Sequence, residues 1–248
     1  MGSISRAKFR HVLDHVTRIR PDIADPRAAI IAGHVLIDGH VVTNPRSQVR
    51  ADAAVVLRVP RALRGEDKLR AALDRFAIDV TGRICVDLGA SAGGFTRVLL
   101  ERGASRVYAV DAGHGQLRGD LRIDPRVVNL ERTNLGDLSS IPREHAIDVV
   151  TMDLSYLSVA DAVPQIETLE FSPEADLVAL VKPMFELGLD TPPADDPSLH
   201  RALDLAVVGV ERCPWRVIGT MPSPVTGSKG ARESLVHGRR TSDDARYR

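Results

Sequence analysis

Cysteine is scarce in this sequence, with two residues among 248. Cys85 and Cys213 both stand in apolar, strand-like surroundings, which is typical of buried thiols and does not suit a disulfide framework or a metal site. Long apolar runs are also missing, since no stretch approaches the roughly 20 residues that span a bilayer. Residues 1–20 are polar and basic, without the apolar centre of a signal peptide. We therefore expect a cytoplasmic protein with no metal ion and no membrane contact.

A net charge is lacking too, because 33 basic side chains balance 33 acidic ones. The balance hides a difference along the chain. Residues 1–65 contain 11 Lys and Arg against 5 Asp and Glu, a charge of +6, and the remainder contains 22 against 28, a charge of −6. This split suggests that a polyanion binds the N-terminal segment, although a solvated basic face on a small domain explains the same numbers.

The first 60 residues predict a small α+β domain. Helices are expected at 6–20 and 26–33, a hairpin around Asp38-Gly39, and a strand at 53–59. This order, together with the stretch Gly33–Val42, resembles the S4 RNA-binding domain. Basic and histidine side chains are the candidate RNA contacts, namely Arg6, Lys8, Arg10, Arg18, Arg20, His34 and His40.

A short basic linker is expected at 61–65, and from Glu66 the apolar pattern changes. Helical segments then alternate with seven apolar runs, which predict strands at 84–88, 106–110, 127–130, 147–152, 176–181, 214–220 and 232–237. Such alternation indicates a Rossmann-like α/β domain over 66–240, with a mostly parallel seven-stranded sheet and helices on both faces. Residues 241–248 are expected to form a disordered tail.

The most informative segment runs from Ile84 to Val98, where an apolar strand leads into a glycine-rich turn and a helix. Glycines let a ligand approach the backbone, and free N–H groups at the helix start favour a polar or negative ligand. The next strand ends in Asp111, where a carboxylate can accept both hydroxyls of an adenosine ribose. Because the glycine spacing is G-x-x-x-G-G and not G-x-G-x-x-G, S-adenosylmethionine (SAM) is favoured over NAD as the cofactor.

Two further side chains with chemical potential follow predicted strands. Asp153 ends strand 147–152, and Lys182 ends strand 176–181, so both are expected beside the cofactor. Taken alone, Asp153 is also explained as a helix cap. A lysine directly after a buried strand is costly unless it meets an anion or loses its proton, so a snorkelling surface lysine is the less favoured explanation of Lys182. Lys68 and Glu233, taken alone, pass as exposed charges.

The combination of motifs resembles the TlyA/hemolysin-type family, in which an S4 domain precedes an FtsJ-like methyltransferase. The motifs are Arg64–Leu69, Val86–Thr96, Val107–Leu117, Asp153–Ser158 and Leu180–Glu186, and the likeness covers nearly the whole chain. The resemblance implies SAM-dependent 2′-O-methylation of ribosomal RNA, usually at a cytidine, within an rRNA or a ribosomal subunit.

The resemblance also implies a catalytic tetrad of Lys68, Asp153, Lys182 and Glu233. Lys182 is then the base or the group that orients the ribose oxygen, and the two carboxylates hold the ammonium groups. For the cofactor the candidates are Asp111 on the ribose, Asp87 as an organiser of the turn or a contact of the amino group, Thr133 and Asn134 near the adenine, and the turn residues Gly89, Ala90, Ser91, Gly93, Gly94 and Phe95.

Three residues depart from the family pattern, namely Glu66, Met184 and Arg232. They leave two other interpretations open. One is a diverged SAM-dependent methyltransferase of a small molecule or another substrate, and the other is an RNA-binding protein without catalysis.

Overall fold

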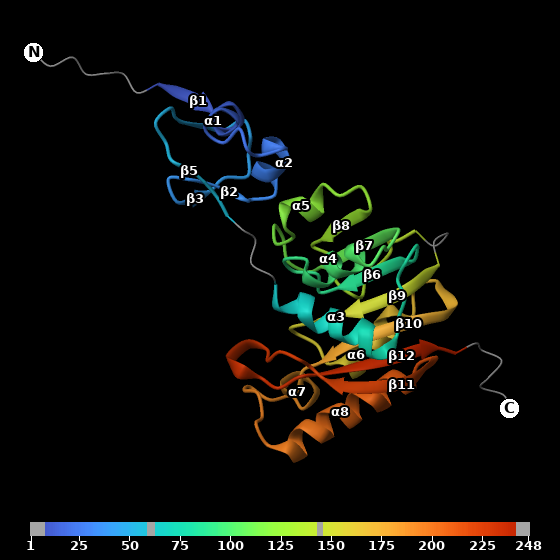
Figure 1. Cartoon of the computed structure of the whole chain (residues 1–248). Helices are drawn as coiled ribbons and strands as arrows, with labels where there is room; N and C mark the ends of the chain where they lie inside the picture. Colours follow the sequence, from blue (N-terminus) through green and yellow to red (C-terminus); the bar gives the residue numbers. More distant parts are fainter. Residues whose placement is uncertain (1–7, 59–62, 143–145, 242–248) are drawn as a thin grey trace, which may run out of the picture. The chain divides into compact units, whose positions relative to one another are not determined.

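The computed structural model describes residues 8–58, 63–142 and 146–241, and these form two compact units (Figure 1). One unit contains the residues up to 62 together with 118–124, and the other contains 63–117 and the residues from 125 onward. Helix α3 (Arg64–Phe76) begins two residues before the predicted start of the second domain. Residues 61 and 62 of the predicted linker, and the predicted tail from residue 242, lie outside the described residues.

Within residues 8–58, two small sheets and two short helices make up the N-terminal unit, to which α5 (Gly119–Arg122) also belongs. Strands β2 (Val35–Ile37), β3 (His40–Val41) and β5 (Val55–Leu57) form an antiparallel sheet in the order β3-β2-β5. Strand β1 (Phe9–His11) pairs with β4 (Gln48–Arg50), and the helices are α1 (Val12–Ile19) and α2 (Pro26–Ile31). The core consists of six buried apolar side chains, Val12, Val16, Ile30, Val35, Ile37 and Ala53.

The predicted hairpin is present in this unit. Asp38 and Gly39 have φ values of 48° and 81°, as a two-residue turn between twisted strands requires. The predicted first helix is wrong at its start, because Phe9–His11 is a strand whose residues pair with β4, Phe9 lying opposite Arg50. Strand β1 is fully exposed and β4 nearly so, and neither carries the apolar alternation that marks a half-buried strand.

The second unit is built on one seven-stranded sheet. Its order is β11-β12-β10-β9-β6-β7-β8, and the five strands from β10 to β8 run parallel. Strand β12 is antiparallel to both of its neighbours. The bounds are β6 Ile84–Leu88, β7 Arg106–Asp111, β8 Val127–Glu131, β9 Ile147–Met152, β10 Phe171–Val181, β11 Trp215–Pro222 and β12 Ser234–Arg240. All seven predicted strands and the mostly parallel sheet are thereby confirmed.

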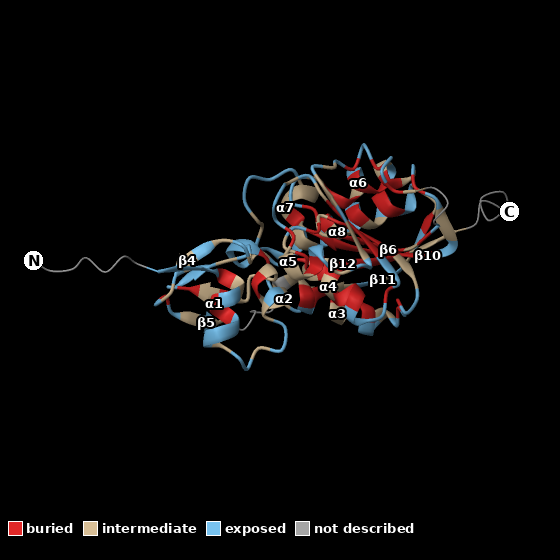
Figure 2. Ribbon diagram, turned by 90° about the horizontal axis from the view of Figure 1, so that it is seen from above, coloured by how far each residue is buried: buried red, intermediate tan, exposed pale blue. Residues whose placement is uncertain are grey.

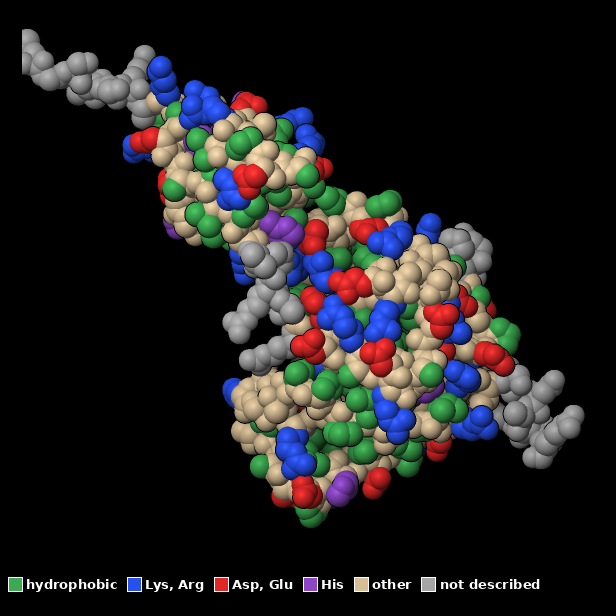
Figure 3. Space-filling model, viewed as in Figure 1, with side chains coloured by type: hydrophobic (Ala, Val, Ile, Leu, Met, Phe, Trp, Pro, Cys, Tyr) green, Lys and Arg blue, Asp and Glu red, His purple; other side chains and the backbone are tan. Residues whose placement is uncertain are grey.

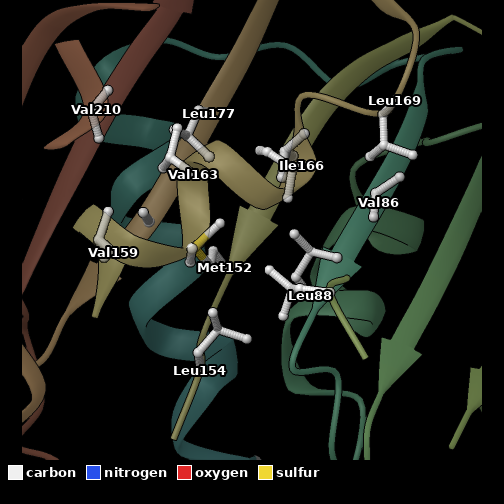
Figure 4. Close-up of a cluster of buried hydrophobic side chains, with 14 of the residues drawn as sticks. Val86, Leu88, Met152, Leu154, Val159, Val163, Ile166, Leu169, Leu177 and Val210 are labelled. Atoms are coloured by element: carbon white, nitrogen blue, oxygen red, sulfur yellow. The ribbon is translucent and has the colours of Figure 1, made fainter. Parts of the chain in front are cut away.

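Helices cover both faces of this sheet (Figure 2). One face carries α3 and α4 (Gly94–Glu101), and the other carries α6 (Val159–Ile166) and α8 (Asp196–Glu211). Two single-turn helices, α5 (Gly119–Arg122) and α7 (Pro183–Glu186), and a 3₁₀ turn at Ser228–Gly230 complete the described elements. The largest core lies under α6, where side chains of β6, β9 and β10 meet those of the helix (Figure 4).

Cys85 is buried, Cys213 is partly buried, and the two do not form a disulfide. Within the described residues, no helix is long and apolar enough to cross a membrane. The same part of the chain holds no cluster of three or more His, Cys, Asp or Glu side chains arranged to bind a metal ion.

Candidate active site

The glycine-rich turn after β6 lies between the ends of β7 and β9. Gly89 and Ala90 both donate their backbone N–H to the carbonyl of Val110, at 2.9 and 3.0 Å. Gly89 has a φ of +82°, and a Cβ atom there would lie 2.5 Å from the carbonyl oxygen of Asp153. A residue without a side chain is therefore required at this position, for both backbone conformation and space.

Asp87 is fully buried beneath this turn. Thr96 and Thr151 donate their hydroxyl groups to its two carboxylate oxygens, at 2.6 and 3.0 Å. Burial raises the pKa of Asp87 to about 6 against the effect of these hydrogen bonds. The side chain thus ties β6 to α4 and β9, and it does not line the cavity described next.

Asp111, at the end of β7, organises the loop that follows it. Its carboxylate accepts hydrogen bonds from the backbone N–H of Ser91 (2.8 Å) and of Gly113 (2.6 Å). Glu131, at the end of β8, accepts from the backbone N–H groups of Gly115, Gln116 and Leu117 at 2.9–3.2 Å. Two carboxylates therefore hold the loop after β7 in place, and only the first is among the predicted site residues.

A cavity of about 360 Å³ opens beside these groups at the carboxyl edge of the sheet. We call it the cofactor cavity. Six predicted site residues line it, namely Gly89, Ser91, Asp111, Thr133, Asp153 and Lys182. Eight further residues complete the wall, and they were not predicted: Val110, Ala112, Gly113, Gln116, Leu135, Leu154, Ser155 and Tyr156.

The other predicted cofactor residues do not line this cavity. Ala90 and Phe95 are buried in the fold, and Asn134 is exposed. Gly93 is the N-terminal cap of α4 with a φ of +94°, and Gly94 lies against α3, where a Cβ atom would be 3.3 Å from the α-carbon of Gly65. These residues shape the turn from behind, while Thr133 and Leu135 reach the cavity on either side of Asn134.

The four predicted catalytic side chains form two ion pairs. The Nζ atom of Lys182 lies 2.6 Å from Oδ1 of Asp153, and this pair is partly exposed. The Nζ atom of Lys68 lies 2.5 Å from Oε2 of Glu233, and both of these side chains are about 95% buried. Lys68 comes from α3 and Glu233 precedes β12, so the second pair joins residues 165 positions apart.

A second cavity, of about 220 Å³, begins at Lys182. We call it the distal cavity. Its walls are Ser155, Lys182, Pro183, Met184, Phe185, Asp190, Pro192, Ser228, Lys229, Ala231 and Glu233. Ser155 and Lys182 line both cavities. Lys182 therefore stands where the two cavities meet.

The three departures from the family pattern occupy different surroundings. Glu66 is buried, lies 3.3 Å from Arg70 and 3.5 Å from Arg97, and receives a hydrogen bond from the backbone of Leu63. Arg232 makes an exposed ion pair with Asp196 at 2.7 Å. Met184 lines the distal cavity. Of the three departures, only Met184 therefore lies in the wall of the distal cavity. It is also the only one of them that is not part of an ion pair.

The predicted RNA contacts in the N-terminal unit differ in exposure. Lys8, Arg10, Arg18 and His40 are exposed, His34 is partly buried, and Arg6 lies outside the described residues. Arg20 is paired with Asp22 at 2.6 Å, which offsets its charge. On the face shown in Figure 3, Lys and Arg side chains of this unit are interspersed with Asp and Glu.

The chain shares its sequence and fold with known methyltransferases. The model of the FtsJ-like methyltransferase family matches residues 62–240. The 16S/23S rRNA (cytidine-2′-O)-methyltransferase TlyA of Mycobacterium tuberculosis is 43% identical over 223 residues, which cover 86% of this chain and 83% of that protein. Hemolysin A of Brachyspira hyodysenteriae is 34% identical, over 84% of this chain and 90% of that protein.

A solved structure of a related protein shows the same fold. A protein from Streptococcus thermophilus described as a hemolysin superposes with a TM-score of 0.66 at 28% identity, over 96% of this chain and 90% of that one. The sheet order, the cofactor cavity and these similarities all indicate the same family. The chain belongs to the TlyA/hemolysin A family of FtsJ-like methyltransferases, which use S-adenosylmethionine as the methyl donor.

Proposed function

We propose that this protein methylates the 2′-oxygen of a cytidine ribose in ribosomal RNA, and that it does so in the cytoplasm, where ribosomes are found. The observation that carries the proposal is the place of Lys182, which is paired with Asp153 and lines both the cofactor cavity and the distal cavity. The 43% identity to an rRNA (cytidine-2′-O)-methyltransferase over most of both chains supports this choice of substrate.

The cofactor cavity fits SAM in its chemistry. Each oxygen of Asp111 accepts one backbone hydrogen bond and keeps acceptor capacity for the hydroxyls of a ribose. Gly113 lets the loop pass close to this carboxylate, since a Cβ atom there would lie 2.9 Å from Oδ1 of Asp111. Leu135 and Val110 offer an apolar wall for a purine. When bound, SAM supplies a methyl group on a cationic sulfur.

The protein residues would position the ribose oxygen and handle its proton. A 2′-hydroxyl is a weak nucleophile until its proton is removed or strongly hydrogen-bonded, and displacement at the methyl carbon needs the oxygen, carbon and sulfur in line. The ammonium group of Lys182 has three donors, of which Asp153 occupies one. It can hold the oxygen by a hydrogen bond, or take up the proton after giving up its own. The buried pair of Lys68 and Glu233 lies beside the distal cavity, because Glu233 lines that cavity together with Lys182.

The decisive experiment supplies unmethylated 30S and 50S subunits with labelled SAM and maps any methylated ribose. Lys182→Ala should leave SAM binding nearly intact and lower methyl transfer about 10²-fold or more, the range for a positioned acid–base group. Lys182→Arg keeps the charge, so recovery of activity in this variant indicates an orienting role, and continued loss indicates a proton-transfer role. A wild-type-like rate in Lys182→Ala would contradict the proposal.

We further propose that the S4-like N-terminal unit docks the RNA. Exposed Lys8, Arg10 and Arg18 supply charge for phosphate contacts, whose contribution falls steeply with salt. Reversing these three residues to Glu should raise the KM for subunits and leave SAM binding unchanged. Arg216→Glu, on the exposed part of β11, is the charge-reversal control. If the triple variant methylates subunits at the wild-type rate, the docking role is refuted and a small-molecule substrate gains support.

A further inference from the structure

The distal cavity combines three chemical features on its walls. Pro183, Met184 and Phe185 give it an apolar side, Lys229 gives it a cation, and Asp190 gives it a carboxylate. Within the described part of the chain, neither Lys229 nor Asp190 makes a hydrogen bond or an ion pair, and both are exposed. The cavity is therefore lined by charged groups that are available to a ligand.

Lys229 is held in an unusual backbone conformation. Its φ is +56° and its ψ is +26°, which is the left-handed region that residues other than Gly, Asn and Asp rarely adopt. Two backbone bonds close the loop around it, from Gly227 N–H to the Ala231 carbonyl (2.8 Å) and from Ala231 N–H to the Ser228 carbonyl (3.1 Å). Glycine would fit this position without strain, so the lysine is kept there at a cost in backbone strain.

Lysine is also rare in this chain. Of the 33 Lys and Arg residues, 29 are arginine and four are lysine, at positions 8, 68, 182 and 229. Lys182 and Lys229 line the distal cavity, and Lys68 is paired with Glu233, which lines it too. Three of the four compact ammonium charges thus gather around one cavity, and the fourth, Lys8, is exposed in the N-terminal unit.

We propose that the distal cavity binds the target nucleotide, with Lys229 on a phosphate next to the target ribose and Asp190 accepting a hydrogen bond from the exocyclic amino group of cytosine. This rests on the proposed function, because that function places the ribose 2′-oxygen at Lys182. The nucleotide must leave its stack to reach this depth, and the apolar wall at Phe185 replaces the lost stacking. A carboxylate accepts from the cytosine amino group and repels the uracil carbonyl at the same position.

The phosphate contact is tested on Lys229→Gly, with Arg216→Ala as a control that removes one exposed charge from the same unit. Glycine relieves the backbone strain, so the thermal midpoint should stay the same or rise. The KM for subunits should rise about tenfold, and the dependence of log KM on log salt should become shallower by about one unit. Lys229→Arg should recover most of the affinity. A Lys229→Gly enzyme indistinguishable from Arg216→Ala would overturn the phosphate contact.

The base contact is tested on Asp190→Ala with subunits whose target cytidine is replaced by uridine. The wild type should prefer cytidine, and the variant should lose that preference by about tenfold in the ratio of kcat/KM. An unchanged preference would refute the role of Asp190.

A direct binding measurement separates this proposal from the proposed function. Cytidine 3′-monophosphate should bind the wild-type protein in the presence of S-adenosylhomocysteine, and Lys229→Gly should weaken that binding while Arg216→Ala does not. If no subunit is methylated but this binding pattern holds, the proposed function fails and the cavity assignment stands. If subunits are methylated but the nucleotide binds both variants equally, the cavity assignment alone fails.

Discussion

Gly89 and Asp153 touch through their backbones, and a single methyl group on the α-carbon of Gly89 would come within 2.5 Å of the Asp153 carbonyl oxygen. The glycine turn and the Asp153–Lys182 pair are therefore one mechanical unit. A change in the turn that is usually associated with the cofactor must also move the carboxylate that holds Lys182.

Gly89→Ala should consequently lower both SAM binding and kcat, because Asp153 has to shift away. Gly82→Ala is a matched control, since Gly82 also has a positive φ (+71°) but has no atom within 4 Å of the added methyl group. Both variants should lose about 1–2 kcal/mol of stability from backbone strain. Only Gly89→Ala should lose activity when both are assayed below their melting temperatures, and equal activities would refute the coupling.

Asp111→Ala should weaken SAM binding at least tenfold, which corresponds to about 1.4 kcal/mol. The change removes the ribose acceptor and also frees the N–H groups of Ser91 and Gly113. Titration calorimetry measures the effect, with Asp137→Ala as an exposed carboxylate control. Unaltered SAM affinity would remove Asp111 from the site.

The buried pair of Lys68 and Glu233 can be separated into structural and chemical contributions. Lys68→Met alone should cost about 3–5 kcal/mol of unfolding free energy, because it leaves Glu233 buried without a partner. Adding Glu233→Met should restore most of the stability and none of the methyl transfer. Recovered activity in the stable double variant would show that the pair only supports the fold.

Two buried carboxyl groups predict a pH dependence of stability. Burial raises the pKa of Asp87 to about 6 and that of Glu186 to about 7, from ordinary values of 3.8 and 4.5. The folded state then keeps protons that the unfolded state has released, so the stability from these groups falls as pH rises from about 4 to about 7.

Urea unfolding at pH 5 and pH 8 measures this fall. Glu186→Gln and Asp87→Asn should each reduce the difference in unfolding free energy between the two pH values, and Glu174→Gln, on an exposed part of β10, should not. Asp176 acts in the opposite direction and at lower pH. Although burial opposes it, hydrogen bonds from His237, Arg83 and Arg239 lower its pKa to about 2, so its contribution is lost below about pH 4.

The large sheet was predictable because each of its strands is a short apolar run followed by a polar strand end or a turn. The positions of Asp111, Asp153 and Lys182 in one cavity follow from the same rule, since the carboxyl ends of parallel strands share an edge. Strands β1 and β4 were not predictable, because three exposed residues carry no periodic signal and pair only through tertiary contact.

The loop residues around the cavity could not be predicted from the sequence either. The positions of Gln116 and Tyr156 depend on loop paths, and on the hydrogen bonds that Glu131, at the end of β8, accepts from the loop backbone; no local pattern encodes these. Asn134 and Thr133 are adjacent in sequence, yet only Thr133 reaches the cavity. Which of two neighbours faces a ligand depends on the backbone direction after a strand ends, and that direction is set by the rest of the fold.

The last strand of the large sheet along the chain, β12, is inserted between β10 and β11, and the residue just before it supplies the partner of Lys68. During synthesis, β10 and β11 therefore each have an edge without a partner strand until β12 has left the ribosome. A chain that stops early lacks Glu233 and presents open strand edges, which favour aggregation and removal by proteases.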